Sequence, residues 1–240
     1  MEIFGPLFLS SIAGLATCLG IIFTYIKPKN NNKFIAISLS FAMGVMILIS
    51  IKELIPIPLK EILLSYKLPF NLLMCLIMPL MALIMVYLSN KCINSNSSLY
   101  KVGILSMITL FLHNIPEGIA TFISTLTNQT LGIKLTMAIM AHNIPEGICI
   151  SVPIYYATKK RGKAFFYTFI AGIAEPIGGI LMYVLFKNYI TLKVLNLVLY
   201  FIGCLMMTIS IKELLPEIFS YKNKTWLIDG LLLSLFILFL

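Results

Sequence analysis

Long apolar segments, separated by short polar breaks that contain lysine, follow one another along the whole chain. Each segment approaches the length of about 20 residues that a helix needs to cross the hydrocarbon core of a bilayer. We therefore predict an all-α membrane protein in which residues 1–240 form a single transmembrane domain with eight transmembrane helices. The approximate spans are 5–26, 34–55, 70–89, 102–126, 132–157, 164–186, 194–215 and 221–240. The last span is the least regular, because Asp229 interrupts it.

The composition excludes a water-soluble protein. Of the 240 residues, 60% are hydrophobic and only 11% are charged, whereas a soluble domain carries about 25% charged residues. This excludes a soluble globular enzyme, and it excludes a nucleic-acid-binding protein despite the formal net charge of +9.

The basic residues predict how the chain is oriented in the membrane. With the eight spans above, 12 of the 18 Lys and Arg residues lie on one side and 6 on the other. Because cytoplasmic loops carry the excess of basic residues, we predict that the richer side is cytoplasmic. Both termini are then extracytoplasmic.

Two sequence repeats indicate internal symmetry. The hexapeptide His-Asn-Ile-Pro-Glu-Gly occurs at residues 113–118 and again at 142–147. The sequence ISIKELIP at 49–56 is repeated as ISIKELLP at 209–216, an offset of 160. In both pairs the two spans cross in opposite directions, so we predict an inverted internal repeat that relates spans 1–3 to spans 6–8 and span 4 to span 5. Such repeats are typical of transporters that bind their substrate near the membrane midplane.

The hexapeptide brings metal-ligand chemistry to one face of each helix. Its polar residues are His113, Asn114 and Glu117 in the first copy and His142, Asn143 and Glu146 in the second. Positions i and i+4 share a helix face, so the imidazole and the carboxylate of each copy point the same way, and the amide borders that face. Pro116 and Pro145 also free backbone carbonyls, which is tolerated where the backbone lines a cavity.

Glu175 in the sixth span adds a third intramembrane carboxylate to Glu117 and Glu146. Ionisable residues inside spans are costly and usually mark function. No Lys or Arg is predicted at a comparable depth, so the natural counter-charge is one divalent cation or two. Imidazole, carboxylate and amide ligands together suit Zn²⁺, Fe²⁺, Mn²⁺, Co²⁺ or Cd²⁺ better than Mg²⁺. The alternative is a structural hydrogen-bond lock between helices.

On these motifs the sequence resembles the ZIP family of divalent metal transporters, most closely its bacterial ZupT-type branch. The resemblance rests on the doubled hexapeptide, the eight spans and the Ala-Glu-Pro sequence around Glu175, and it covers nearly the whole chain. It implies a transporter domain, not an enzyme, that takes zinc or another divalent transition metal across the cell membrane into the cytoplasm. It also implies alternating access, with spans 1, 4, 5 and 6 moving against spans 2, 3, 7 and 8.

The resemblance further implies a binuclear metal site between spans 4, 5 and 6. The main metal would be held by His113, Glu117, His142 and Glu146, and a neighbouring metal by Asn114, Asn143 and Glu175. Glu117 and Glu146 would bridge the two metals, and Met46, in a Gly-x-Met sequence of span 2, is a candidate soft ligand. Two features depart from relatives: residues 89–101 contain no histidine, and Asn143 stands where some relatives carry aspartate.

Glu53 ends span 2 and Glu213 ends span 7, and the 160-residue offset relates them. We hypothesise that they are the entrance and exit carboxylates of one pathway. The alternative is an interfacial Lys–Glu pair at each helix end.

Two other functions stay open at this point, an intramembrane metalloenzyme and a metal efflux carrier. The expected partners are divalent metal ions and the lipid bilayer, with a homodimer as a further candidate and no nucleic acid.

Overall fold

Helices make up all the regular structure in the residues that the computed structural model describes, which are 3–92, 97–186 and 191–238. The α-helices are α1 (Phe4–Ala16), α2 (Asn31–Ile49), α3 (Pro56–Ser65), α4 (Phe70–Cys92), α5 (Ser98–Thr127), α6 (Gln129–Thr158), α7 (Arg161–Leu181), α8 (Leu192–Ile209), α9 (Leu215–Ser220) and α10 (Lys224–Leu238). A 3₁₀ segment, η1 (Thr17–Tyr25), and three π-helical segments, η2 (Ser50–Leu54), η3 (Met182–Phe186) and η4 (Ser210–Leu214), extend four of them. The predicted all-α class is confirmed.

Seven of the described helical segments are long and apolar enough to cross a membrane. They are Phe4–Tyr25, Asn31–Ser65, Phe70–Leu88, Leu99–Thr127, Gln129–Thr158, Arg161–Leu185 and Lys193–Ser220. The described part of α10 has only 15 residues. The eighth span, expected at 221–240, therefore stays a prediction.

Side-chain caps explain why two central helices begin earlier than predicted. The side chain of Ser97 accepts a hydrogen bond from the Tyr100 backbone N–H, and Asn128 accepts one from the Leu131 N–H. Ser and Asn are preferred at this position because their oxygens satisfy a backbone donor that the helix leaves unpaired. As a result α5 begins at Ser98 and α6 at Gln129, each a few residues before the first strongly apolar stretch.

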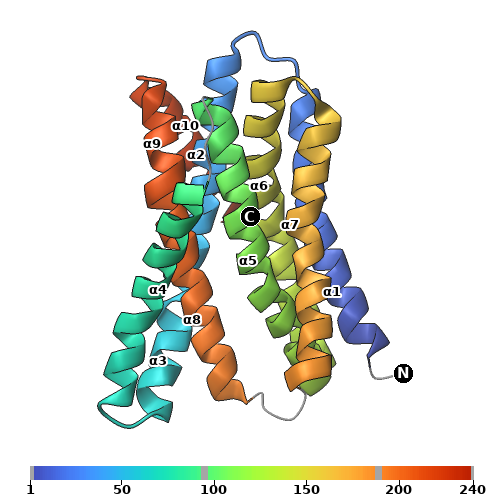
Figure 1. Ribbon diagram of the computed structural model, residues 1–240, viewed down its shortest axis with the longest axis vertical. Coiled ribbons are helices and arrows are strands. Elements are labelled where there is room, and N and C mark those ends of the chain that lie inside the picture. Colours follow the sequence, from blue (N-terminus) through green and yellow to red (C-terminus); the bar gives the residue numbers. More distant parts are fainter. Residues whose placement is uncertain (1–2, 93–96, 187–190, 239–240) are drawn as a thin grey trace.

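The two SIKEL segments at 50–54 and 210–214 both adopt a π-helical turn directly before a proline-containing helix. In the first, the Ile55 N–H donates to the Ser50 carbonyl over 2.9 Å. Proline has no N–H and crowds the carbonyl four residues before it, so a wider turn lets the chain pass Pro56 without ending the helix. The second predicted span therefore runs on to Ser65, and the seventh runs on to Ser220. The two segments run in opposite directions (Figure 1).

The helices form two groups that lie side by side (Figure 1). In the first, which we call the four-helix bundle, α5 packs along α6 and α7, and α1 with η1 closes the opposite side against α6 and α7. In the second, the flanking helices, α10 packs on α2, and α4 packs on α8. The groups meet where α2 contacts α6 and where α8 contacts α5.

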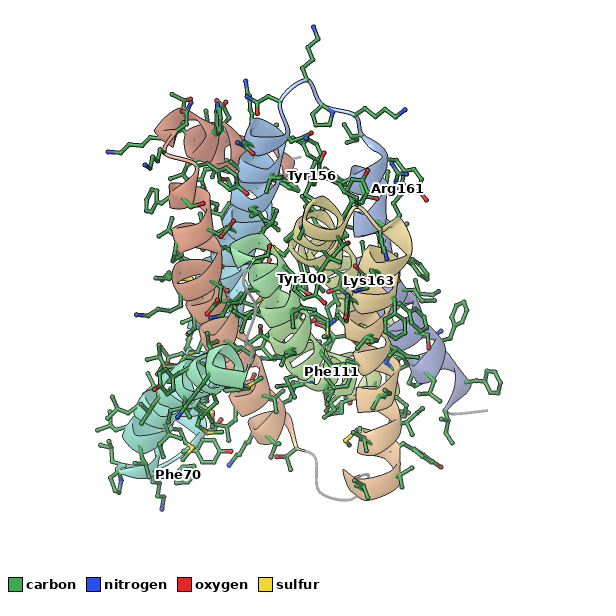
Figure 2. The ribbon with its side chains drawn as sticks, turned by 45° about the horizontal axis from the view of Figure 1, so that its top comes forward. Phe70, Tyr100, Phe111, Tyr156, Arg161 and Lys163 are labelled. Carbon is green, nitrogen blue, oxygen red and sulfur yellow. The ribbon has the colours of Figure 1, made fainter. Side chains whose placement is uncertain are left out.

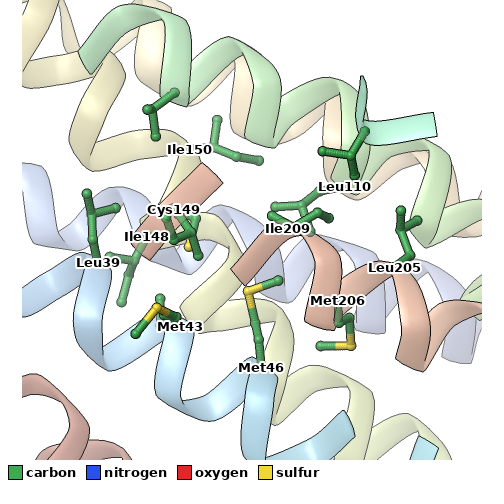
Figure 3. Packing of buried hydrophobic residues seen from close by; sticks show 14 of the residues in the cluster. Leu39, Met43, Met46, Leu110, Ile148, Cys149, Ile150, Leu205, Met206 and Ile209 are labelled. Atoms are coloured by element: carbon green, nitrogen blue, oxygen red, sulfur yellow. The ribbon is translucent and has the colours of Figure 1, made fainter. Parts of the chain in front are cut away.

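A buried apolar cluster fills this junction (Figure 3). Leu39 and Met46 of α2, Ile148 of α6 and Leu205 of α8 are all fully buried in it. The polar residues of α5 and α6 lie beside this cluster, deep between the helices and shielded from the surroundings.

Candidate metal site

Each copy of the hexapeptide lies inside a continuous 30-residue helix, the first in α5 and the second in α6. Pro116 and Pro145 are helix-internal, so each helix continues past its proline. The glycine that ends each copy brings a neighbour close: a side chain at Gly118 would overlap the backbone of Glu175, and one at Gly147 would overlap the backbone of Thr17. Close backbone approach of this kind is typical of helix packing in membranes.

Both histidines meet carboxylates of the opposite copy. His113 Nε2 lies 3.3 Å from Glu117 Oε1 and 3.2 Å from Glu146 Oε1. His142 Nε2 lies 3.0 Å from the same Glu117 oxygen. All four residues are buried. The atoms of His113, Glu117 and Glu146 that could bind a metal ion lie within 4.8 Å of one another. The structure thus brings the two copies of the motif together into one polar cluster.

The two asparagines are held so that their side-chain oxygens stay free. Asn114 Nδ2 donates to the Ala171 carbonyl over 3.0 Å, and Asn143 Nδ2 donates to the Ala13 carbonyl over 2.8 Å. Asn143 Nδ2 also donates to Glu175 Oε1, which places this carboxylate beside the asparagine. The Oδ1 atoms of both asparagines are buried and have no hydrogen-bond partner.

Unpaired acceptors dominate the cluster. Besides the asparagine oxygens, the Oε2 atoms of Glu117, Glu146 and Glu175 are buried without a hydrogen-bond partner. Within the part of the chain that the structure describes, no Lys or Arg side chain is buried. A buried charge is retained in a protein when it is paired or when it coordinates a metal. This donor set is therefore suited to a cation.

Met46 lies on α2, fully buried among the apolar side chains of the junction, in the cluster that also contains Met43 and Cys149 (Figure 3). This position is that of a packing residue. Its role as a metal ligand stays a prediction.

Glu53 lines a cavity of about 150 Å³ together with Glu117 and His142. Apolar side chains complete the wall, among them Ile139 and Leu199. The cavity links the end of the second predicted span with the polar cluster.

Glu213 is separate from this cavity. Only 6% of its surface is exposed, and it lines a second cavity of about 260 Å³ with Lys101, Lys212 and Glu217. The two glutamates thus border different cavities, Glu53 one that reaches the polar cluster and Glu213 one between α5, η4 and α9.

Sequence reasoning does not find the backbone carbonyls of Ala13 and Ala171, which fix the two asparagines. The available signal is the small residues beside them, such as Gly14 and Gly172, whose backbones approach each other too closely for any larger side chain. Small residues indicate that helices touch, but they do not indicate which carbonyl then meets which amide.

Comparison with known proteins gives the family. The ZIP Zinc transporter family model matches residues 94–239. The Zinc transporter ZupT of Chlorobaculum parvum is 36% identical over 93% of this chain and 91% of its own length. The proteins of the same name from Clostridium perfringens and Streptococcus mutans are 32% and 31% identical, over 96% and 99% of this chain and 92% and 96% of their own lengths. The chain therefore belongs to the ZIP zinc transporter family, a family of membrane transporters and not of enzymes.

Proposed function

We propose that this protein moves zinc, and with it other divalent transition metals, across the cell membrane into the cytoplasm by alternating access through a binuclear site. One observation carries the proposal. Imidazole, carboxylate and amide groups from both copies of the hexapeptide converge in a buried cluster where no Lys or Arg side chain of the described residues is buried. The whole chain, 1–240, then acts as one transmembrane transporter domain.

The spacing of the donors supports a zinc ion in the first site. Zinc binds imidazole nitrogen and carboxylate oxygen at about 2.0–2.2 Å, so two ligands of a tetrahedral ion lie about 3.3 Å apart. The contacts of His113 with Glu117 and Glu146 are 3.3 and 3.2 Å, and His142 contacts Glu117 at 3.0 Å. In this proposal these four side chains hold the main metal. The distances between their nitrogen and oxygen atoms are already close to those between two ligand atoms of one zinc ion.

The free asparagine oxygens support the neighbouring site. Asn114 and Asn143 direct their amide N–H groups to backbone carbonyls, so each can offer only its oxygen to a metal. Glu175 adds a carboxylate, and the second oxygens of Glu117 and Glu146 can bridge to the first metal. An all-oxygen site beside a mixed site would let the second ion bind more weakly than the first.

The two bordering cavities support a pathway. We place Glu53 at the extracytoplasmic entrance, because its cavity already reaches Glu117 and His142. We place Glu213 at the exit, because it lines the cavity beside Lys101 on the side predicted to be cytoplasmic. In the alternating-access step, the four-helix bundle would move against the flanking helices, opening the site to one side and then to the other.

Two alternatives rank lower. Membership of a transporter family disfavours an intramembrane metalloenzyme, and neither histidine belongs to a zinc-protease motif such as HExxH. An efflux carrier would use the same ligands in the opposite direction. The homodimer stays a prediction.

A flux experiment tests both function and direction. The purified protein is placed in vesicles of known orientation, and uptake of radioactive zinc is followed. We expect accumulation on the cytoplasmic side. We expect Glu117→Ala or His142→Ala to lower the rate at least about 100-fold, because even residues that only hydrogen-bond to a metal ligand contribute about 10–100-fold. Leu76→Ala, at a side chain that is 71% exposed on α4, is the matched control. Zinc flux that is unchanged in both site variants would contradict the proposal, and flux in the opposite direction would favour efflux.

A further inference from the structure

A cavity of about 340 Å³ lies apart from the metal site, at the junction of η1, α2 and α10. It is lined by Phe23, Phe34, Ile37, Ser38, Phe41 and Leu233. Its wall is largely apolar: five of the six lining side chains are aromatic or aliphatic, and the sixth, Ser38, is buried. None of the residues proposed to handle the metal borders it.

The cavity follows α2 inward from the beginning of that helix. Phe34 lies in the first turn of α2, and Phe41 lies seven residues further along the same helix. At a rise of about 1.5 Å per residue, these positions are about 10 Å apart along the helix axis. Leu233 extends the wall on α10, and Phe23 closes it from η1. An apolar slot of this length matches one section of an acyl chain.

Lysines are concentrated in the chain segments that adjoin this slot. Lys27 and Lys29 lie in the link between η1 and α2, and Lys33 lies in the first turn of α2, directly before Phe34. Lys222 and Lys224 stand at the beginning of α10. All five side chains are exposed. Asp229 is the one acidic residue of α10, so the local balance is strongly positive.

We propose that this slot binds an anionic phospholipid of the cytoplasmic leaflet, with one acyl chain between η1, α2 and α10 and the head group on Lys27, Lys29 and Lys33. Basic pockets between helices on the cytoplasmic side of membrane proteins bind anionic head groups, and the leaflet itself is negatively charged. The inference rests on the proposed orientation, in which this end of the molecule faces the cytoplasm. Tyr156 and Arg161 lie at the same end (Figure 2).

The position of the slot gives the lipid a role. η1 belongs to the four-helix bundle and packs on α6 and α7, whereas α2 and α10 belong to the flanking helices. A lipid in the slot therefore touches both groups at the place where they would move against each other. We expect zinc flux to rise when anionic lipid is available, because the lipid fills a gap that would otherwise be left between the groups.

Lipid binding can be measured without any metal. The full-length protein is purified in detergent, mixed with defined amounts of phosphatidylglycerol or phosphatidylcholine, and examined by native mass spectrometry. We expect phosphatidylglycerol to bind in preference to phosphatidylcholine. Removing two head-group contacts in Lys29→Gln/Lys33→Gln should weaken phosphatidylglycerol binding about 30-fold, at about 1 kcal/mol for each lysine.

Two further variants distinguish lipid binding in the slot from a general attraction of anionic lipid to surface lysines. Lys91→Gln/Lys163→Gln removes the same charge from exposed positions on the same predicted side, on α4 and α7, which do not line the slot, and should leave binding unchanged. Ile37→Trp fills the slot while all five lysines remain, and should also reduce binding. Equal binding of both lipids, or equal losses in the two double-lysine variants, would overturn the proposal. Because the readout is bound lipid and not zinc, its failure would leave the transport function untouched.

Discussion

α4 and α6 are both apolar enough to cross a membrane, but they have opposite surroundings. α4 is the least buried of the seven candidate spans and the more apolar of the two, with side chains such as Leu76 and Leu80 largely exposed. α6 is the most buried and the least apolar, and its middle carries His142, Asn143 and Glu146. In water, an apolar helix would be expected inside and a polar one outside.

The apolar helix is the exposed one because the surroundings of a membrane protein are lipid and not water. Lipid tails are as apolar as leucine, so burying leucine against protein gains little, and helices associate through close packing and polar contacts. Glycine provides the close packing around α6: Gly147 contacts the backbone of Thr17, and Gly20 contacts the backbone of Gly147. Around α6, polar and small residues therefore mark the interior, whereas α4 shows that a strongly apolar helix can lie at the exposed surface.

The largest loss of stability is expected when a side chain is introduced at a glycine that contacts a neighbouring helix. Gly118→Val would push a side chain into the backbone of Glu175, whereas Gly162→Val, on α7, meets nothing within 4 Å. Overpacking against side chains costs about 1–3 kcal/mol, and a clash with backbone should reach or exceed that upper value. We expect Gly118→Val to lose folded protein in a thermal stability assay, with Gly162→Val close to the wild type. Equal stability of the two variants would show that close approach at Gly118 is not needed.

Truncating an apolar side chain should matter on α6 and not on α4. Ile154 of α6 is fully buried, and Leu76 of α4 is 71% exposed. Ile154→Ala leaves a cavity inside the protein and should cost about 2 kcal/mol or more, whereas lipid fills the space left by Leu76→Ala, which should stay within about 0.5 kcal/mol. Reversible unfolding in mixed micelles measures both. A larger loss at Leu76 would mean that α4 is covered by protein, as in a homodimer.

Met46 tests whether the flanking helices contribute chemistry as well as packing. Met46→Leu keeps the volume in the apolar cluster and should change stability by less than about 1.5 kcal/mol. If the thioether is a ligand, the variant should lose a few-fold of its cadmium uptake relative to manganese, because sulfur prefers soft metals. Competition flux assays give this ratio. An unchanged ratio would assign Met46 to packing alone.

Glu53 should have the smallest effect, because it is exposed, borders the cavity at the proposed entrance and is not one of the proposed metal ligands. Glu53→Gln removes the charge that attracts the cation and keeps the shape of the side chain. We expect KM for zinc to rise a few-fold with kcat nearly unchanged, and the rise to shrink at high ionic strength. Unchanged uptake kinetics would support the alternative of an interfacial Lys–Glu pair.

Much of this arrangement could be predicted from the sequence. The spacing within the hexapeptide predicted that His113 shares a helix face with Glu117, and His142 with Glu146. That the two pairs meet was implied by the resemblance to a known family. The placement of helix ends was less accurate, since the π-turn before Pro56 carries the chain past a residue that normally ends a helix. Local propensity does not include such an adjustment.

The pairings across helices were also beyond sequence reasoning. That His142 meets Glu117, or that Asn114 donates to Ala171, depends on how far each helix is rotated about its axis. Glycine contacts such as that of Gly118 with Glu175 set this rotation, and they depend on three-dimensional packing. The residues of the polar cluster are therefore readable from the sequence, while the hydrogen bonds and contacts between them are not.

The central claim is that the buried cluster holds two transported metals. The most direct measurement is the number of zinc ions bound per chain at saturation, determined on purified protein that has been stripped of metal and reloaded. We predict two ions in the wild type, one in Asn143→Ala/Glu175→Gln, and loss of both in Glu117→Ala/Glu146→Ala, which removes the bridging carboxylates. A single ion in the wild type, or two ions retained when both bridging carboxylates are gone, would contradict the account.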